Sequence, residues 1–183
     1  MTRVVDRGAI FAGWVGLGMG LVTVIALELI LALQTLVFLA APLIGVLAGV
    51  YANVRSERWQ PRGRVIANAA YCGLVTGLGL AIMYVALRLL FVFADSGARP
   101  DGSQIVCQPG PDCTYQRYVE LGQGDELAAI GVTDGATFQA AVLREQLNGG
   151  VTLAVLTLGG SVVAGAARSV RGARREPVAY APG

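Results

Sequence analysis

The stretch that decides the fold is Ala9–Ala52, AIFAGWVGLGMGLVTVIALELILALQTLVFLAAPLIGVLAGVYA, which runs for 44 residues with one charged side chain, Glu28. A helix needs about 20 apolar residues to cross the hydrocarbon core of a bilayer. The stretch therefore predicts two membrane-spanning helices joined by a very tight turn. Gln34 and Thr35 are the most polar neighbours near its middle, so we expect the turn at Leu33–Leu36.

Two more apolar runs follow. Val65–Ala94 is interrupted only by Asn68 and Arg88, and Val151–Ala167 is shorter and rich in Gly, Ala and Val. A cleaved signal peptide would have an apolar region of about 7–15 residues, whereas the first run is much longer and continues into a second span. We therefore predict an all-α integral membrane protein, a bundle of four transmembrane helices.

The arginines give this bundle an orientation. The N-terminus, the loop between the second and third spans and the C-terminal tail hold ten Arg and three acidic residues, a net charge of +7. The segment between the third and fourth spans holds three Arg and eight acidic residues, a net charge of −5. Because Arg flanks spans on the cytoplasmic side, both termini are predicted to be cytoplasmic, in the cell membrane. Anionic lipid or nucleic acid on the basic face is the weaker interpretation, since orientation alone requires these arginines.

The predicted layout has eight segments. They are a cytoplasmic N-terminus (1–8), transmembrane helix 1 (9–33), transmembrane helix 2 (36–54), a basic cytoplasmic loop (55–64), transmembrane helix 3 (65–94), an acidic extracytoplasmic segment (95–148), transmembrane helix 4 (150–168) and a basic cytoplasmic tail (169–183).

The composition excludes several classes of function. Every one of the 14 basic residues is Arg, and the chain has no His. A haem or zinc site with a His ligand, a His general base and a Ser-His-Asp triad are therefore excluded. The sequence also lacks the HExxH, GxSxG and P-loop motifs. We expect no catalytic residues, no cofactor and no metal, and hence a protein that is not an enzyme.

The extracytoplasmic segment contains two cysteines, Cys107 and Cys113, on either side of a Gln-Pro-Gly-Pro-Asp turn composition. Thiols outside the cytoplasm are readily oxidised, so we predict a structural disulfide. The flanking Val, Ile, Thr and Tyr residues favour a small β-hairpin pinned by it. A metal pair assisted by Asp112 or a redox pair is the alternative, although the spacing is not C-x-x-C. Cys72 in the third span is interpreted as a small buried hydrophobe.

A short helix is expected later in this segment. Asp134 is placed to cap a helix over Gly135–Leu147, and Asn148–Gly150 is placed to end it. The surrounding acidic residues suit an ordinary solvated surface, with attraction of a cation or a basic partner as the alternative.

Small residues recur at every fourth position in all four predicted spans. Such faces allow close helix–helix packing, within the chain or with a partner. The predicted packing positions are Ala12, Gly16, Gly20, Gly45, Gly49, Gly73, Gly77, Ala81, Ser161 and Gly165.

Glu28 and Arg88 are the charged residues within the apolar runs. An intramembrane charge is costly and is a candidate functional site for that reason. Both lie at a similar distance from the extracytoplasmic ends of their spans, which predicts an ion pair between spans one and three. Snorkelling of Arg88 is a second structural alternative. The functional alternative is a proton or cation site at Glu28 whose pKa is adjusted by Arg88.

Three functions are compatible with this pattern, and we rank them. The first is a non-catalytic accessory, assembly or structural subunit that acts through helix contacts and its extracytoplasmic segment. Its partners are the bilayer and a membrane protein or further copies of itself, without nucleic acid or a small-molecule ligand. The second is a small homo-oligomeric transporter or channel with Glu28 as its proton or cation site. The third, a membrane enzyme, lacks any supporting motif.

Overall fold

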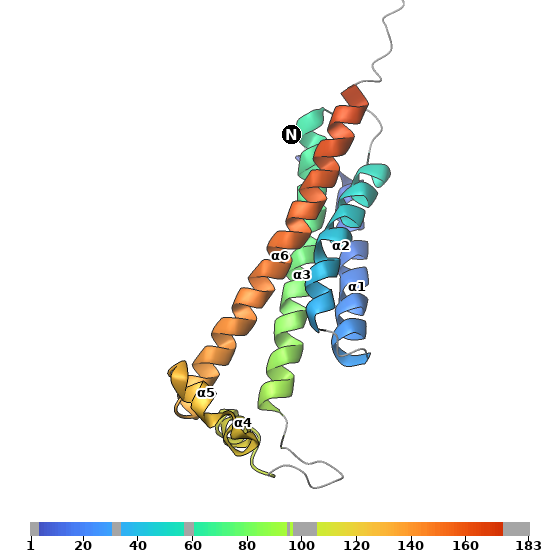
Figure 1. Ribbon diagram of the computed structural model, residues 1–183. Helices are drawn as coiled ribbons and strands as arrows, with labels where there is room; N and C mark the ends of the chain where they lie inside the picture. Colours follow the sequence, from blue (N-terminus) through green and yellow to red (C-terminus); the bar gives the residue numbers. More distant parts are fainter. Residues whose placement is uncertain (1–3, 31–33, 57–60, 95, 97–105, 174–183) are drawn as a thin grey trace, which may run out of the picture. The chain divides into compact units, whose positions relative to one another are not determined.

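The structure is a computed structural model that describes residues 4–30, 34–56, 61–94, 96 and 106–173. All regular secondary structure in these ranges is helical (Figure 1). The elements are α1 (Arg7–Ile25), a π-helical turn η1 (Ala26–Ile30), α2 (Gln34–Arg55), α3 (Arg62–Phe93), α4 (Pro111–Tyr118), a second π-helical turn η2 (Val119–Gln123), α5 (Gly124–Ala129) and α6 (Gly135–Ala173).

Four of these helices are long and apolar enough to cross a membrane. The candidate spans are Arg7–Glu28, Thr35–Arg55, Arg62–Phe93 and Gly135–Val170. The chain divides into two compact units, each described here by itself. Unit 1 comprises Met1–Ala81 and Val151–Gly183, and unit 2 comprises Ile82–Gly150. Both α3 and α6 contribute one part to each unit.

Unit 1 is a bundle of α1, α2, the first part of α3 and the last part of α6 (Figure 1). One cluster of its core is built from small side chains: Ala9, Ala12, Ala48, Ala52 and Cys72 are buried together, with Tyr51 packed against them. Leu80 and Leu153 are fully buried as well. Other large apolar side chains, such as Leu43, Leu47 and Leu78, point outward instead. This arrangement suits a bundle in lipid, where the outside is as apolar as the core and close backbone approach provides the packing energy.

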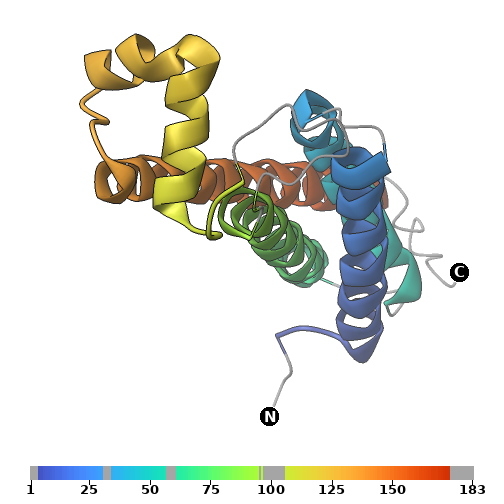
Figure 2. The same ribbon diagram turned by 90° about the horizontal axis from the view of Figure 1, so that it is seen from below.

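Unit 2 contains the second part of α3, the short helices α4 and α5 with η2 between them, and the first part of α6. Figure 2 shows α4, η2 and α5 as a path of short helices that bends back toward the start of α6. Gly122 and Gly131, both with φ of 81°, allow two of these bends, because this backbone conformation is strained for residues with a Cβ. Phe138 on α6 is buried against the rings of Tyr115 and Tyr118 on α4.

The predicted turn at Leu33–Leu36 is wrong for its last three residues. Gln34 and the two residues after it form the first turn of α2, and residues 31–33 lie outside the described residues. Polar side chains do not need to mark a turn here, since the first turn of a helix has unpaired N–H groups that polar neighbours suit.

The predicted β-hairpin around the cysteines is also wrong. Cys113 and the residues up to Tyr118 belong to helix α4, while Ile105 lies outside the described residues. Pro111 stands at the first helical position and Asp112 in the first turn, both of which favour a helix start. These signals outweigh the modest β-propensity of Thr and Tyr.

The helix that starts after Asp134 does not end at Asn148–Gly150, as the sequence suggested. It continues as α6 for 39 residues, about 58 Å at 1.5 Å per residue. Gly149 has a packing role in this helix: a Cβ there would lie 2.9 Å from Cε1 of Tyr84, so only glycine leaves room for the ring. Close packing of this kind offsets the low helix propensity of glycine.

Candidate functional site

Glu28 lies in η1, the π-helical turn that continues α1. Its side chain is half-buried. Turns of π-helix are rare, and those inserted within α-helices frequently lie at functional sites. The local backbone therefore sets Glu28 apart from the rest of its span.

Arg88 belongs to α3 in unit 2, where its guanidinium lies over the ring of Tyr84 at 5.5 Å from the centroid. Tyr84 is buried and packs on α6 at Gly149. A cation over an aromatic face gains energy from the ring quadrupole, more so away from water. Sequence reasoning missed this contact between Arg88 and Tyr84, which lies one helical turn earlier. The i, i+4 spacing of the two residues indicates that their side chains can meet on one face of a helix.

The predicted ion pair between Glu28 and Arg88 stays a prediction. Glu28 is part of unit 1 and Arg88 is part of unit 2, and each contact above belongs to one unit alone. The same holds for the proton or cation site at Glu28.

The predicted packing glycines of unit 1 face neighbouring helices within the same chain. On α1, Gly16 lies against Thr76 and Gly20 against Leu80, both on α3. Gly45 and Gly49 on α2 lie against the backbone of α6 at Thr157 and Ser161. Gly73 and Gly77 on α3 face α6, and Gly165 on α6 faces Ala69 on α3. Of the two predicted alanines, Ala12 is fully buried and Ala81 is half-buried.

Ser161 adds a polar contact to this packing. Its side chain is fully buried, and its hydroxyl donates a hydrogen bond of 2.6 Å to the backbone carbonyl of Ala69 on α3. A serine of this kind links two helices without adding bulk between them. Gly160 completes the α2–α6 contact, because a methyl group there would overlap the carbonyl oxygen of Pro42.

Sequence reasoning missed a buried polar cluster in unit 1, formed by Asp6, Ser56 and Asn68. Asn68 is fully buried: its side-chain oxygen accepts the backbone N–H of Asp6 at 3.0 Å, and its amide nitrogen donates to the Asp6 carboxylate at 3.0 Å. The same nitrogen donates to the Ser56 hydroxyl at 3.2 Å. The signal was Asn68 itself, because a buried amide within an apolar run needs hydrogen-bond partners.

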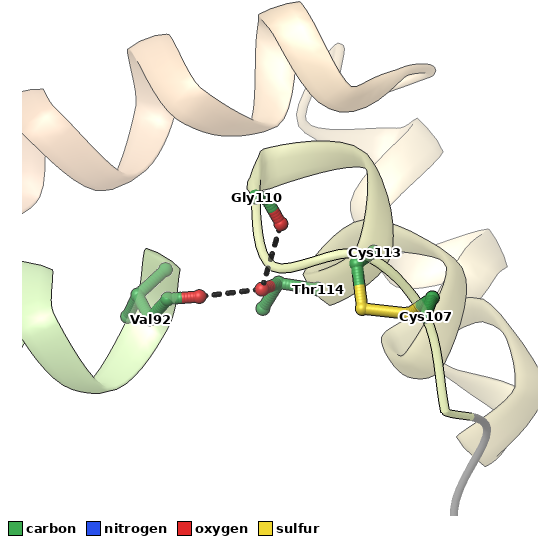
Figure 3. The surroundings of a disulfide bond; sticks show 5 residues. All are labelled: Val92, Cys107, Gly110, Cys113 and Thr114. Atoms are coloured by element: carbon green, nitrogen blue, oxygen red, sulfur yellow. Dashed lines mark hydrogen bonds between the residues drawn. A yellow bond between two sulfur atoms is a disulfide. The ribbon is translucent and has the colours of Figure 1, made fainter. Parts of the chain in front are cut away.

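In unit 2, Cys107 and Cys113 form a disulfide with a Cα–Cα distance of 5.6 Å (Figure 3). The next residue, Thr114, is buried and donates its hydroxyl hydrogen to the carbonyl of Val92 near the end of α3. It lies 3.2 Å from the carbonyl of Gly110 as well. The disulfide and Thr114 together fix the start of α4 against the end of α3.

The start of α6 is held by a reciprocal cap. The carboxylate of Asp134 accepts the backbone N–H of Thr137 at 2.8 Å, and the Thr137 hydroxyl accepts the N–H of Asp134 at 3.1 Å. The hydrogen bonds from Thr137 lower the pKa of Asp134 below its ordinary value of 3.8. The predicted role of Asp134 as the cap of this helix is confirmed.

None of the residues in the segment formed by η2 and α5 is buried. It exposes Val119 and Leu121, the latter by 64%, and is followed by Ile130, which is 73% exposed. Its acidic side chains, Glu120, Asp125 and Glu126, are exposed beside them.

Within the described ranges, no three His, Cys, Asp or Glu side chains are grouped so that they could hold a metal ion. Comparisons with protein-family models, with curated proteins and with solved structures find no match to this chain. The candidate sites therefore stand on their own chemistry: a carboxylate on a π-helical turn, a half-buried arginine over a buried tyrosine, and an exposed apolar and acidic segment.

Proposed function

We propose that this chain is a non-catalytic multi-pass protein of the cytoplasmic membrane, an accessory, assembly or structural subunit. Its termini lie in the cytoplasm, and the segment 95–148 lies outside. It acts on a partner membrane protein through the segment formed by η2 and α5 and the outward faces of its helices.

The observation that carries this proposal is the exposure of the η2 and α5 segment. A short helical segment in water normally buries its apolar side chains, and none is buried here. Exposed apolar groups rimmed by polar ones are typical of interaction surfaces. The packing of unit 1 supports the same proposal, since its small residues are used within the chain and leave the outer segment as the distinctive surface.

Photo-crosslinking in living cells tests this directly. A photo-reactive amino acid replaces Leu121 or Ile130, and in a matched control it replaces Gln139, which is exposed on α6. We expect one discrete heavier adduct from the first two positions and none from the control. Equal adducts from all three positions, or none from any, would contradict a docking role for this segment.

The orientation needs its own test. A cysteine introduced at Gln139 should react with a membrane-impermeant maleimide in intact cells, because the position is exposed and predicted to be outside. A cysteine in place of Arg168 should react only after the cells are opened. The opposite labelling pattern would reverse the proposed topology.

A second candidate, a small homo-oligomeric transporter or channel, is favoured by one observation. Glu28, its proposed proton or cation site, lies on the π-helical turn η1. Wild-type protein and the Glu28→Gln variant should then differ in proton or cation flux when reconstituted in vesicles. Equal flux in both, or no flux above that of empty vesicles, rules this candidate out.

A further inference from the structure

Four exposed arginines of unit 1 lie at helix ends. Arg7 begins α1, Arg55 ends α2, Arg62 begins α3, and Arg168 lies in the last turns of α6. They come from segments that are far apart in the sequence. Their positions matter because the four helix ends meet.

Contacts within unit 1 bring these ends together (Figure 1). A methyl group at Gly8 would overlap the carbonyl oxygen of Arg55, so the start of α1 lies against the end of α2. Gly165 packs on Ala69 and on the backbone of Ile66, which places the end of α6 against the start of α3. The hydrogen bonds between Asp6 and Asn68 join the start of α1 to α3.

Among the described residues, the acidic residue at this end is Asp6, and it is turned inward. It is only 9% exposed, and its carboxylate accepts a hydrogen bond from Asn68 instead of capping α1. Within the described ranges the four-arginine end of unit 1 presents a strongly positive surface.

Two of these arginines stand where the fold itself disfavours them. Arg7 and Arg62 begin helices that have no acidic residue in the first turn, and a cation is unfavourable at the positive end of a helix dipole. Arg55 suits its place at a helix C-terminus and lies over the ring of Phe11, 5.3 Å from its centroid. Phe11 and Trp14 point outward on α1, 51% and 65% exposed, next to the arginine end.

We propose that this four-arginine end binds the phosphate headgroups of anionic phospholipids, with Phe11 and Trp14 beside the acyl chains. The inference rests on the membrane location of the chain but not on its role as an accessory subunit. Guanidinium groups bind phosphate through paired hydrogen bonds, and clustered arginines next to a span suit an anionic lipid surface. A bound phosphate would also offset the unfavourable interaction of Arg7 and Arg62 with their helix dipoles.

Native mass spectrometry of the full chain in a neutral detergent tests the proposal. The probes are phosphatidylglycerol and phosphatidylcholine with identical acyl chains. Wild type should hold phosphatidylglycerol at least tenfold more tightly than phosphatidylcholine. Each arginine removed should weaken phosphatidylglycerol binding about fivefold, so Arg62→Gln with Arg168→Gln should weaken it about 25-fold.

Arg144→Gln is the matched control, because it removes the same charge from an exposed position on α6 in unit 2. It should leave phosphatidylglycerol binding unchanged. Arg7→Gln alone provides a second variant if the double variant melts at a lower temperature.

Three results would overturn the proposal. Equal binding of the two lipids by wild type is the first, and an equal loss per charge in Arg144→Gln is the second. The third is a short DNA duplex that binds more tightly than phosphatidylglycerol and displaces it, which would assign the surface to nucleic acid. None of these results bears on the crosslinking test of the accessory role.

Discussion

The two units of this chain are each stabilised internally by different kinds of contact. Unit 1 uses close backbone approach at glycine and alanine, one buried polar cluster and an interhelical serine bond. Unit 2 uses a disulfide, a reciprocal helix cap and an aromatic cluster. Long helices can share long close contacts at small residues, whereas short helices gain more from covalent and polar fixation.

The largest effect should come from the polar cluster of unit 1. Asn68→Ala removes the hydrogen bonds to the backbone and carboxylate of Asp6 and leaves both buried groups without that partner, so we expect a loss of about 3 kcal/mol in the free energy of unfolding. Titration of detergent micelles with sodium dodecyl sulfate, followed by circular dichroism, measures it.

Asn53→Ala is the matched control, since the Asn53 amide donates only to Gly49 on its own helix. It should cost less than about 1 kcal/mol. Equal losses of unfolding free energy in Asn68→Ala and Asn53→Ala would mean that the polar cluster stabilises unit 1 no more than a hydrogen bond within one helix does.

The second-largest effect should come from the disulfide, which we expect to contribute most to the stability of unit 2. Replacing Cys107 and Cys113 by serine opens a loop with a sequence separation of 6, and the chain-entropy model predicts a loss of about 2 kcal/mol. Hydrogen exchange should show faster exchange in α4 and unchanged exchange in α1 and α2. Cys72→Ala should show the reverse pattern, because Cys72 is buried in unit 1. Faster exchange in the helices of both units after either change would contradict separate stabilisation of the two units.

Two adjacent glycines on α6, Gly159 and Gly160, test whether close backbone approach between helices stabilises unit 1. Gly160→Ala places a methyl group against the Pro42 carbonyl and should destabilise unit 1 by about 1–2 kcal/mol. A methyl group at Gly159 meets nothing within 4 Å, so Gly159→Ala should be neutral or stabilising by up to about 1 kcal/mol. Thermal unfolding in detergent compares them, and the opposite order of stability would refute the packing described above.

The smallest effect should come from the cap of α6, and it depends on pH. The pKa of Asp134 is lower in the folded chain than its ordinary 3.8, so its contribution is present above that value and is lost as the pH falls through the lower folded pKa. The protection factors of the Ala136 and Thr137 amides, which correct for the pH dependence of intrinsic exchange, should therefore fall at acidic pH in wild type. Asp134→Ala should show the lower protection factors already at neutral pH and should lack the acid-dependent fall.

Much of the fold follows from sequence patterns at particular residues. The length of the apolar runs determines four long helices, and Asp134 is identified as a cap by its place before a periodic segment. The errors arose where a local signal has two meanings. Asn148–Gly150 resembles a helix end, and Thr114 and Tyr115 resemble a strand, because propensities say nothing of the ring of Tyr84 or of the carbonyl of Val92.

The candidate sites were less predictable than the fold. Glu28 and Arg88 stand out as charges within apolar runs, but the π-helical turn under Glu28 and the ring of Tyr84 under Arg88 needed coordinates. The polar cluster was hidden for another reason: Asp6 and Asn68 are 62 residues apart, and no spacing rule links them.

The sequence by itself determined the membrane character of this protein and the separation of its charges, because both depend on the summed hydropathy and charge of whole segments. Tertiary structure alone decided which small residues face a neighbouring helix, as the contrast between Gly159 and Gly160 shows. It also turned Asp6 inward and brought the four arginines to one end of unit 1. These outcomes depend on which helices meet and in which register, and a short-range pattern carries no information about contacts between distant segments.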